Sequence, residues 1–556
     1  MTITTEISFD SLARKKVRIP AHLIRGSEFY QVPGIKLDGS YFTAPAELRL
    51  LEFANQCSGG ALTLSPEVKS WYSAIVKREE ELVAIQQQSD VTLQHSSGPD
   101  LHPYQRVGVD FMLKSKRSLL CDETGMGKSA TTIVAVEESN VFNKVLLLCN
   151  KSMMEWWKDE IARWSQYHPP VHLCYSSKRE KALDRFLSVG GWLIMNWEQL
   201  PKIESFLRRT RLDWLVADEA HKVKNRKTQR FSAMKLARSR YMTLVTGTPF
   251  ANSTAEVWTL LHLSDRDSYP SYWRFYEMYV AYDEDYLGYR RIKAEARNAH
   301  LLARELRHRM LNRKKEDFFD EMPEKTYVTI PVQMTKRQQT LYEQMEDEMW
   351  LQITDGEEIQ ALSGMTLQMR LRQLASTVAT VDPAIDESGK LDVAAEMCAD
   401  MDGKVVVFAW FRAAVEGLSR RLTKLKIKHV VVMGGLGEQG ANEAKVQFQE
   451  DPEVKVIIGT LGSLGESHTL TAASKMIFIE KHYNPAAQKQ DEDRIHRIGQ
   501  RFPCTYYSLI CPDSVDDIVE SILARKIKIT NEVMMELLKS HLQVRVAAEH
   551  RGRGAD

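Results

Sequence analysis

The sequence predicts an α/β protein that contains two blocks of parallel β-sheet and a small α+β domain before them. Short apolar runs that end on polar or glycine-rich turns alternate with helical patterns after Leu101, and the alternation returns in the last third of the chain. Runs that are apolar on both faces are typical of strands buried in a parallel sheet. The runs are RSLLCD, KVLLLCN, GWLIMN, DWLVADE and YMTLVTGT in the first block, and KVVVFAW, HVVVMG, VKVIIGT and KMIFIE in the second.

The first 95 residues have a different pattern, with short strands, tight turns and two helices. Pro33-Gly34 and Asp38-Gly39 are turn signals, and the segments AELRLLEFANQ and EVKSWYSAIVKREEELVAIQQQ carry helical periodicity. The polar stretch QQQSDVTLQHSSGPD is typical of a linker. Between the two sheet blocks, residues 255–375 are expected to be mostly helical. We therefore expect five parts: an accessory domain for substrate or partner recognition (1–95), a first lobe (96–265), a helical insertion (266–385), a second lobe (386–540) and a disordered tail (541–556).

The composition argues against several classes of protein. The 556 residues carry a formal net charge of only +1, so contact with nucleic acid must use local basic surface rather than a global field. The seven cysteines are scattered and none forms a CxxC pair, which argues against structural zinc or a disulfide framework and fits a reducing cytosol. No signal-peptide core and no long apolar membrane span are predicted. We expect a cytoplasmic protein of a bacterium or phage-infected host, or a nuclear one in a eukaryote.

The stretch CDETGMGKSATT resembles a phosphate-binding loop in which Asp122 replaces the first glycine. A glycine-rich turn between a strand and a helix presents backbone N–H groups to phosphate oxygens, and the helix N-terminus adds a positive dipole. Gly125 and Gly127 permit close approach, Lys128 is placed to reach the β- and γ-phosphates, and Ser129 is a candidate Mg²⁺ ligand. The alternative is an ordinary glycine-rich turn beside a solvated lysine.

The stretch LDWLVADEAH, about 90 residues further along, is an apolar strand that ends in Asp218 and Glu219. An aspartate at a strand tip can hold Mg²⁺, commonly through water, and the following glutamate can polarise an attacking water. Taken alone, the two acids are equally consistent with a helix cap or a surface pair. Because both motifs occur in this order and each follows a strand, we predict a site for ATP and Mg²⁺.

These motifs and the TGTP sequence at residues 246–249 resemble those of helicase superfamily two, in which the phosphate loop often lacks the first glycine. The finer details resemble the Swi/Snf-type DNA translocases, whose loop typically reads D-E-M-G-L-G-K-T, and within them the small HARP-type annealing helicases of bacteria and phages. The resemblance covers roughly residues 100–535 and implies two RecA-like P-loop lobes with helical insertions. It is carried by LHPYQRVGVDFM, NKSMMEWWKDEIARW, TGTPFANSTAEVWTLLHL, SGKLD and NPAAQKQDEDRIHRIGQ.

The resemblance also assigns roles to individual residues. Gln105 takes the place of the glutamine that reads adenine, and the loop from Thr124 to Ala130 holds the phosphates. Arg494 and Arg497 lie three apart on an expected helix and take the place of arginine fingers that touch the γ-phosphate. The alternative for this pair is a charged surface helix. The remaining implied residues are Met126 in the loop, and His221, Thr246, Thr248 and Gln490 for coupling between the lobes.

Contacts with a DNA backbone are expected from Lys, Arg, Ser and backbone N–H groups along the groove between the lobes. Each basic run is equally consistent with a solvated face, and Ser152 with a capping box to Glu155. Trp156 and Trp157 fit the core better than base stacking. In the loop GESHTLTAA, Ser467 departs from a family glycine. The candidates are Lys151, Ser152, Lys224, Arg226, Gly465, Ser467 and the run RHRMLNRKK at residues 307–315.

The sequence therefore predicts a monomeric motor that hydrolyses ATP, with Mg²⁺, to move along duplex or branched DNA with little sequence specificity. Fork remodelling, annealing or displacement of bound proteins are the expected outcomes. Processive strand separation is less expected than these outcomes, because the family that the chain resembles usually lacks a separation pin. Two other classes stay open: a DNA-binding scaffold whose ATPase activity has decayed, and a motor that strips a protein partner recognised by residues 1–95.

Overall fold

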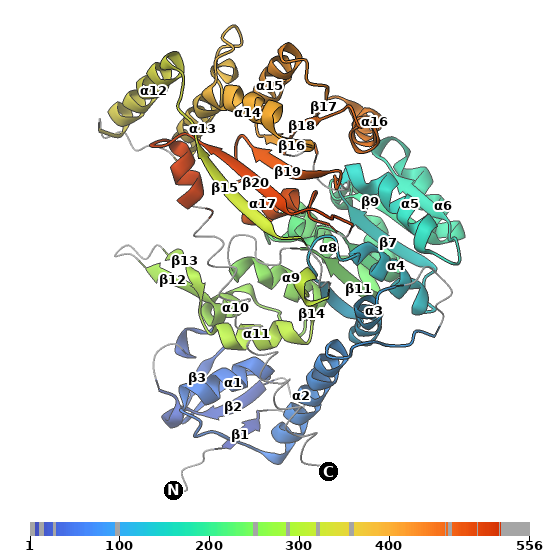
Figure 1. The fold of residues 1–556 in the computed structure, drawn as a ribbon. Helices are drawn as coiled ribbons and strands as arrows, with labels where there is room; N and C mark the ends of the chain where they lie inside the picture. The colour runs from blue at the N-terminus through green and yellow to red at the C-terminus, as the bar shows by residue number, and fades with distance from the viewer. Residues whose placement is uncertain are drawn as a thin grey trace, which may run out of the picture. The chain divides into compact units, whose positions relative to one another are not determined.

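The structure is a computed structural model of the chain, which divides into two compact units between Arg313 and Lys314 (Figure 1). No helix of the described part is long and apolar enough to cross a membrane. The described residues are 6–10, 16–25, 29–94, 101–247, 254–284, 290–318, 323–354, 361–461, 463–464, 470–497, 499–521 and 523.

The first unit begins with a small five-stranded sheet in the order β3-β4-β2-β1-β5. Its neighbours pair antiparallel except for β1 and β5, which are parallel. Gly34 and Gly39 have positive φ angles of 93° and 59°, as the predicted turns require. The elements are β1 (Glu6–Phe9), β2 (Lys16–Pro20), β3 (Lys36–Asp38), β4 (Tyr41–Pro45), α1 (Leu48–Cys57), β5 (Thr63–Leu64) and α2 (Pro66–Gln86).

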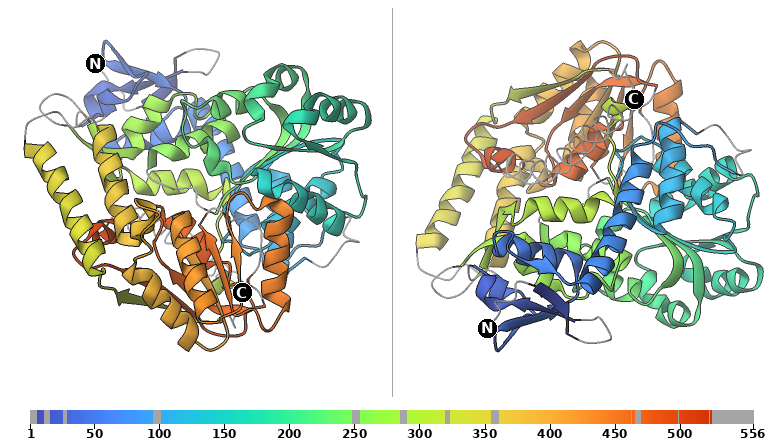
Figure 2. Two further views of the ribbon diagram at one scale, coloured as in Figure 1. Left: turned by 90° about the horizontal axis from the view of Figure 1, so that it is seen from above. Right: turned by 90° about the horizontal axis from the view of Figure 1, so that it is seen from below.

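Helix α2 connects this small sheet to the larger sheet of the same unit (Figures 1 and 2). Leu82 and Ile85 near its C-terminus pack in one apolar cluster with Phe111 and Met112 of α3 (Pro103–Ser115). Ser65 caps the start of α2 by accepting a hydrogen bond from the N–H of Val68. The accessory region is therefore packed onto the first lobe rather than joined to it only by a linker.

The larger sheet of the first unit has seven strands in the order β14-β6-β11-β10-β7-β9-β8, and every neighbouring pair is parallel. Its strands are β6 (Arg117–Leu120), β7 (Lys144–Cys149), β8 (Val171–Cys174), β9 (Gly191–Asn196), β10 (Arg211–Ala217), β11 (Arg238–Val245) and β14 (Met310–Leu311). The helices after α3 are α4 (Lys128–Glu138), α5 (Met154–Trp164), α6 (Arg179–Val189), α7 (Glu204–Arg209), α8 (Gln229–Met234), α9 (Val257–Ser264), α10 (Tyr272–Tyr279) and α11 (Ala299–Arg307).

Both faces of this sheet are covered, which explains the continuous apolar runs in the sequence. In β7, Leu146 and Leu148 belong to one apolar cluster, whereas Val145 and Leu147 belong to the other. Successive side chains of a strand point to opposite faces. A strand buried on both sides therefore needs an apolar residue at every position, as the sequence predicted.

The second unit contains a six-stranded sheet in the order β15-β20-β19-β16-β18-β17, again parallel throughout. Its strands are β15 (Lys325–Pro331), β16 (Lys404–Ala409), β17 (His429–Val432), β18 (Val456–Thr460), β19 (Ala473–Phe478) and β20 (Cys504–Ile510). Its helices are α12 (Lys336–Thr354), α13 (Ala361–Ser376), α14 (Gly389–Asp400), α15 (Arg412–Lys424), α16 (Gly437–Glu450) and α17 (Pro485–Glu492). The predicted α/β class with two blocks of parallel sheet is confirmed.

The expectation that residues 255–375 are mostly helical is wrong at four strands. A hairpin of β12 (Val280–Glu284) and β13 (Arg290–Ala296) follows α10, β14 joins the first large sheet, and β15 joins the second. β14 has only two residues, and the side chains of β15 are half-buried or exposed, so neither gives an apolar run. β8 and β20 were also not predicted from the sequence. The five-part division of the chain stays a prediction.

Candidate nucleotide-binding site

The phosphate-loop motif lies between the end of β6 and the start of α4, at the carboxyl edge of the seven-stranded sheet. Gly127 occupies the N-cap position of α4 with φ 72° and ψ 34°, and Gly125 has φ 86°. Both values lie in the left-handed region that glycine adopts readily. A side chain at Gly127 would also collide with the Gln105 amide. Because the N-cap residue of α4 is a glycine, no side chain of that residue caps the first N–H groups of the helix. These N–H groups can therefore bind an anion.

Asp122, which stands in place of the first glycine, forms a buried ion pair with Arg313. Its Oδ1 accepts hydrogen bonds from the backbone N–H and the Nε of Arg313 at 3.1 and 3.0 Å, and its Oδ2 accepts from Nη2. The N–H groups of Cys121 and Glu123 donate to the carbonyls of Leu311 and Arg313 at 2.7 and 3.0 Å. The first half of the loop is therefore fastened to residues 311–313.

Arg313 was missed in the sequence, where it belongs to a run interpreted as possible DNA contact. That interpretation is wrong for Arg313, because its guanidinium is committed to Asp122 and lies 5.2 Å from the centre of the Tyr104 ring. A side chain at Gly108 would come within 3.0 Å of the same guanidinium. The available signal in the sequence was Asp122 itself. It directly follows the apolar residues LLC, and a buried carboxylate at such a position requires a cation as its partner.

Asp218 lies at the carboxyl end of β10, and two tryptophans hold it. The Nε1–H of Trp157 donates to Oδ2 at 2.9 Å, and the Nε1–H of Trp197 donates to the backbone carbonyl at 3.0 Å. Burial and the neighbouring Glu219 raise the pKa of Asp218 to about 7, although the Trp157 hydrogen bond and the charge of Lys128 oppose the shift. Trp157 is buried, as expected for a core residue, but it also positions a candidate catalytic group.

Glu219 has an unusual backbone conformation for a residue with a side chain. Its φ of 52° and ψ of 50° place it in the left-handed region, and its N–H donates to Oδ1 of Asp218 at 3.0 Å. Nδ1 of His221 lies 3.1 Å from Oε2 of Glu219. Strained conformations of this kind are kept where the surroundings enforce them and are frequent at functional sites.

Lys128 and Gln105 both bind the loop itself. The Lys128 ammonium donates to the carbonyls of Asp122 and Glu123 at 2.8 and 3.1 Å. Gln105 Nε2 donates to the carbonyl of Met126 at 3.3 Å, while its Oε1 accepts from the N–H of His102 at 2.8 Å. The predicted adenine reader thus lies beside the loop, at the start of α3.

The other predicted loop and coupling residues of this unit lie at the same edge. Ser129 and Thr124 are half-buried, whereas Met126 and Ala130 are buried, so the latter two can act only through their backbones. Thr246 follows β11, and its N–H donates to the Leu120 carbonyl of β6 at 3.1 Å. Thr248 lies outside the described residues.

The arrangement fits a nucleotide and Mg²⁺. In the sheet order, β11 separates β6 from β10, so the loop, Thr246 and Asp218 follow three adjacent strands at one edge. Each Asp218 oxygen accepts one hydrogen bond and keeps a second lone pair for a metal-bound water. Asp218 and Glu219 place two carboxyl groups beside one another at this edge, and a divalent cation would offset their burial and like charge.

The predicted DNA contacts differ in their exposure and in the contacts that the structure describes for them. Lys151 and Ser152 are exposed in the turn after β7. Lys224 lies 3.4 Å from Glu256, and Arg226 stacks over the Tyr272 ring at 4.1 Å. α5 starts at Met154 with Met153 as its N-cap residue, and the capping-box alternative for Ser152 stays open. Gly465 and Ser467 lie outside the described residues.

In the second unit, the helix expected to carry the two arginines ends earlier than predicted. α17 stops at Glu492, and Arg494 and Arg497 lie in the turns that follow it, whereas Gln490 is still helical. Asp493 is fully buried, and its Oδ1 accepts from Lys315 and Lys325 at 3.3 and 3.1 Å. This buried ion cluster holds the chain where the helix ends. Burial and the like charge of Arg494 lower the pKa of Arg497 to about 10.

Comparison with known proteins agrees with this geometry. The SNF2-related domain matches residues 104–379, and the helicase conserved C-terminal domain matches residues 389–499. The chain belongs to the Swi/Snf family of helicase superfamily two. The two family matches together cover the phosphate loop, the acid pair and the arginines of this Swi/Snf chain, but they assign no role to any single residue.

Individual relatives of this Swi/Snf chain are distant. A SWI/SNF-related matrix-associated actin-dependent regulator of chromatin subfamily A-like protein 1 homolog from Caenorhabditis elegans is 25% identical over 78% of this chain and 62% of the relative. A DNA annealing helicase and endonuclease from Homo sapiens is 24% identical over 78% of this chain and 40% of the relative. A solved Sulfolobus solfataricus SWI2/SNF2 ATPase core in complex with dsDNA aligns with a TM-score of 0.40 at 21% identity, over 80% of this chain and 95% of that chain. The chain spans less than two thirds of either curated relative.

Proposed function

We propose that this protein is an ATP-dependent DNA translocase that binds and hydrolyses ATP at the carboxyl edge of the seven-stranded sheet. The observation that carries the proposal is the meeting of the glycine loop, with its uncapped helix start, and the Asp218–Glu219 pair at adjacent strand ends. Membership of the Swi/Snf family supports duplex or branched DNA as the track, and the names of the relatives support remodelling or annealing as the outcome.

The residues of the first unit divide the chemistry between them. The N–H groups at the start of α4 bind phosphate oxygens, and Lys128 exchanges its two loop carbonyls for phosphate charge. Ser129, and Asp218 through a water, would hold Mg²⁺, which would supply positive charge to the phosphates. Glu219 orients the attacking water and accepts its proton. Glu219 has a left-handed backbone conformation, and Nδ1 of His221 lies 3.1 Å from its Oε2.

The roles of the remaining residues rest on the family resemblance alone. Arg494 and Arg497 are proposed to stabilise charge in the transition state, and Gln105 is proposed to recognise adenine after releasing the loop. Thr246, His221 and Gln490 are proposed to couple nucleotide state to motion. Partner recognition by the region before residue 95, and action as a monomer, stay predictions.

The proposal is tested by steady-state ATP hydrolysis without DNA and with single strands, blunt duplex and a model fork. Lys128→Ala should lower the stimulated rate at least about 100-fold, because it removes a preorganised positive charge from the phosphates. Lys114→Ala is the matched control, since Lys114 is exposed and paired only with Asp110 of the same helix. A wild-type rate that ignores every DNA would favour the scaffold or the partner-dependent motor instead.

A further inference from the structure

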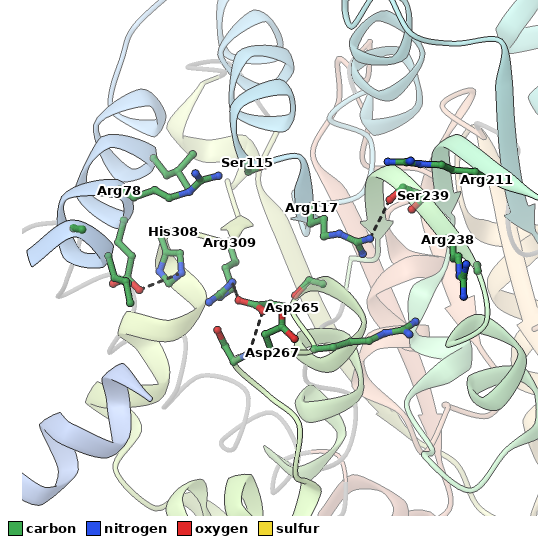
Figure 3. Close-up of a pocket in the computed structure, with 18 of the residues that line it drawn as sticks. Arg78, Ser115, Arg117, Arg211, Arg238, Ser239, Asp265, Asp267, His308 and Arg309 are labelled. Atoms are coloured by element: carbon green, nitrogen blue, oxygen red, sulfur yellow. Dashed lines mark hydrogen bonds and ion pairs between the residues drawn. The ribbon is translucent and has the colours of Figure 1, made fainter. Parts of the chain in front are cut away.

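A large cavity lies in the first unit, at the amino edge of the seven-stranded sheet and therefore at the opposite end of the strands from the phosphate loop. Its volume is about 1020 Å³. Arg117, Arg211 and Arg238 are the first residues of β6, β10 and β11 and line one side of it (Figure 3). Helix α2 and the segments around Asp265 and Arg309 complete its walls. We call this the amino-edge cavity.

The amino-edge cavity is strongly basic although the whole chain is nearly neutral. Its lining contains eight arginines and three carboxylates, a formal excess of five positive charges, whereas the complete chain has a net charge of +1. Two of the carboxylates are already engaged: Asp265 lies 3.0 Å from Arg309, and Glu79 lies 2.5 Å from Arg49. The arginines are Arg78, Arg117, Arg208, Arg209, Arg211, Arg238, Arg266 and Arg309.

Several of these arginines are placed where they repel one another. Arg211 and Arg238 are direct partners in the pairing of β10 with β11, and like charges in this position lower the stability of a sheet. Partial burial lowers the pKa of Arg117, and the like charge of Arg266 lowers it further. Neither Arg211, Arg238 nor Arg266 forms an ion pair with any carboxylate of the described residues. A ligand with closely spaced negative charges would remove this repulsion.

The residue types in the cavity favour phosphodiesters over other anions. Every cationic side chain on the lining is an arginine, whose planar fork binds two phosphate oxygens at once, and no lysine occurs among the described lining residues. Hydroxyl groups of Ser115, Ser239, Ser264 and Ser268 add uncharged donors. A nucleic acid strand carries one phosphate about every 3.4 Å along its axis, so neighbouring strand ends about 4.8 Å apart can engage successive phosphates.

We propose that the amino-edge cavity binds the phosphate backbone of a nucleic acid strand, as a contact separate from any DNA held near the nucleotide site. The inference rests on the proposed function, because DNA is the ligand of this cavity only if the protein acts on DNA. The two sites lie at opposite ends of the same strands. The cavity therefore holds a further segment of the DNA, and its contacts are independent of base sequence because they reach only the backbone.

The test compares two double variants of the full chain that remove equal charge. Arg211→Ala with Arg238→Ala removes the paired arginines of the cavity. Arg163→Ala with Arg185→Ala removes two exposed arginines of α5 and α6 that do not line it. Binding of labelled duplex and forked DNA is measured by fluorescence anisotropy between 50 and 200 mM salt, and thermal unfolding checks that each variant is folded.

The cavity variant should bind DNA about tenfold or more weakly at 100 mM salt, and the slope of log K against log salt should fall by about 2, one for each lost phosphate contact. The control should match the wild type. Arg211→Lys with Arg238→Lys keeps the charge, so it should keep most of the salt slope even if the alanine variant unfolds.

Three results would overturn the inference. The first is equal DNA affinity and equal salt slope in the alanine variant and the wild type. The second is loss of inorganic tripolyphosphate binding in that variant with DNA binding intact, which would make the cavity a small-anion site. The third is a wild type that binds no DNA. Failure of the proposed function is a separate result, namely wild-type hydrolysis that no DNA stimulates.

Discussion

Replacing Arg49 by Met should strongly destabilise the first unit, because this buried cation serves three carboxylates from three helices. Arg49 lies on α1 and is only 4% exposed. Its nitrogens lie 3.0 Å from Glu52 of α1, 2.5 Å from Glu79 of α2 and 3.1 Å from Glu305 of α11. Arg49 therefore links the accessory region to α11, which follows the candidate nucleotide-binding site in the chain.

The size of the effect follows from burial. Removing one partner of a buried ion pair costs about 3–5 kcal/mol, because the remaining charge loses its partner without regaining water. Folded domains have only about 5–15 kcal/mol of stability, so the loss is a large fraction. Arg304→Met is the matched control. Arg304 lies 3.0 Å from Glu52 but is 45% exposed, and an exposed pair contributes about 0–1 kcal/mol.

The assay is urea unfolding of the full chain, followed by tryptophan fluorescence at several pH values. Burial already raises the pKa of Glu79, and Arg49 opposes that shift. Without Arg49, the pKa of Glu79 in the folded state rises further above its value in the unfolded chain. The folded state then binds the proton more tightly than the unfolded chain does. Stability of the variant then falls as the pH rises above about 4.5, and its deficit against the wild type grows toward neutral pH.

Two outcomes would refute this reasoning. A loss below about 1 kcal/mol, or an equal loss in Arg304→Met, would show that the buried cation contributes no more than an exposed pair. A deficit that does not change with pH would show that the carboxylates around Arg49 are not left charged and unpaired in the variant.

Three further predictions concern single contacts. Trp157→Phe keeps the buried ring but removes the donor to Asp218, so urea unfolding should show a loss of about 1.5–3 kcal/mol; no loss would contradict the hydrogen bond. Arg313→Lys keeps the charge but loses the forked contact with Asp122, so the affinity for a fluorescent ATP analogue should fall about tenfold. A variant with wild-type affinity would show that nucleotide binding does not depend on this contact. Burial raises the pKa of Glu47 to about 7, so the wild type loses stability as the pH rises from 4.5 to 7. Glu47→Gln does not titrate, and its free energy of unfolding should therefore gain up to about 3 kcal/mol relative to the wild type over that range. Parallel curves of stability against pH from urea unfolding would refute this.

Local patterns predicted the elements that are buried on both faces or need a special backbone. β7 was visible because the five positions after Lys144 are all apolar, and the glycine loop was visible because Gly125 and Gly127, which adopt positive φ angles in the structure, stand between a strand and a helix. β15 and β20 lacked this signal, since the side chains of β15 are half-buried or exposed and those of β20 mix buried with half-buried positions. The end of α17 was missed because it depends on the burial of Asp493 rather than on the helical pattern.

The sequence by itself determined the class of the fold and the family, and it predicted the glycine loop and the acid pair as nucleotide-binding motifs, because all of these depend on local patterns of apolar, glycine and acidic residues. Only the tertiary structure decided which distant groups meet. Asp122 and Arg313 are 191 positions apart, Trp157 and Asp218 are 61 apart, and three of the arginines of the amino-edge cavity begin three different strands. The order β14-β6-β11-β10-β7 brings these groups together, and that order follows from crossovers through the whole sheet, which no local pattern specifies.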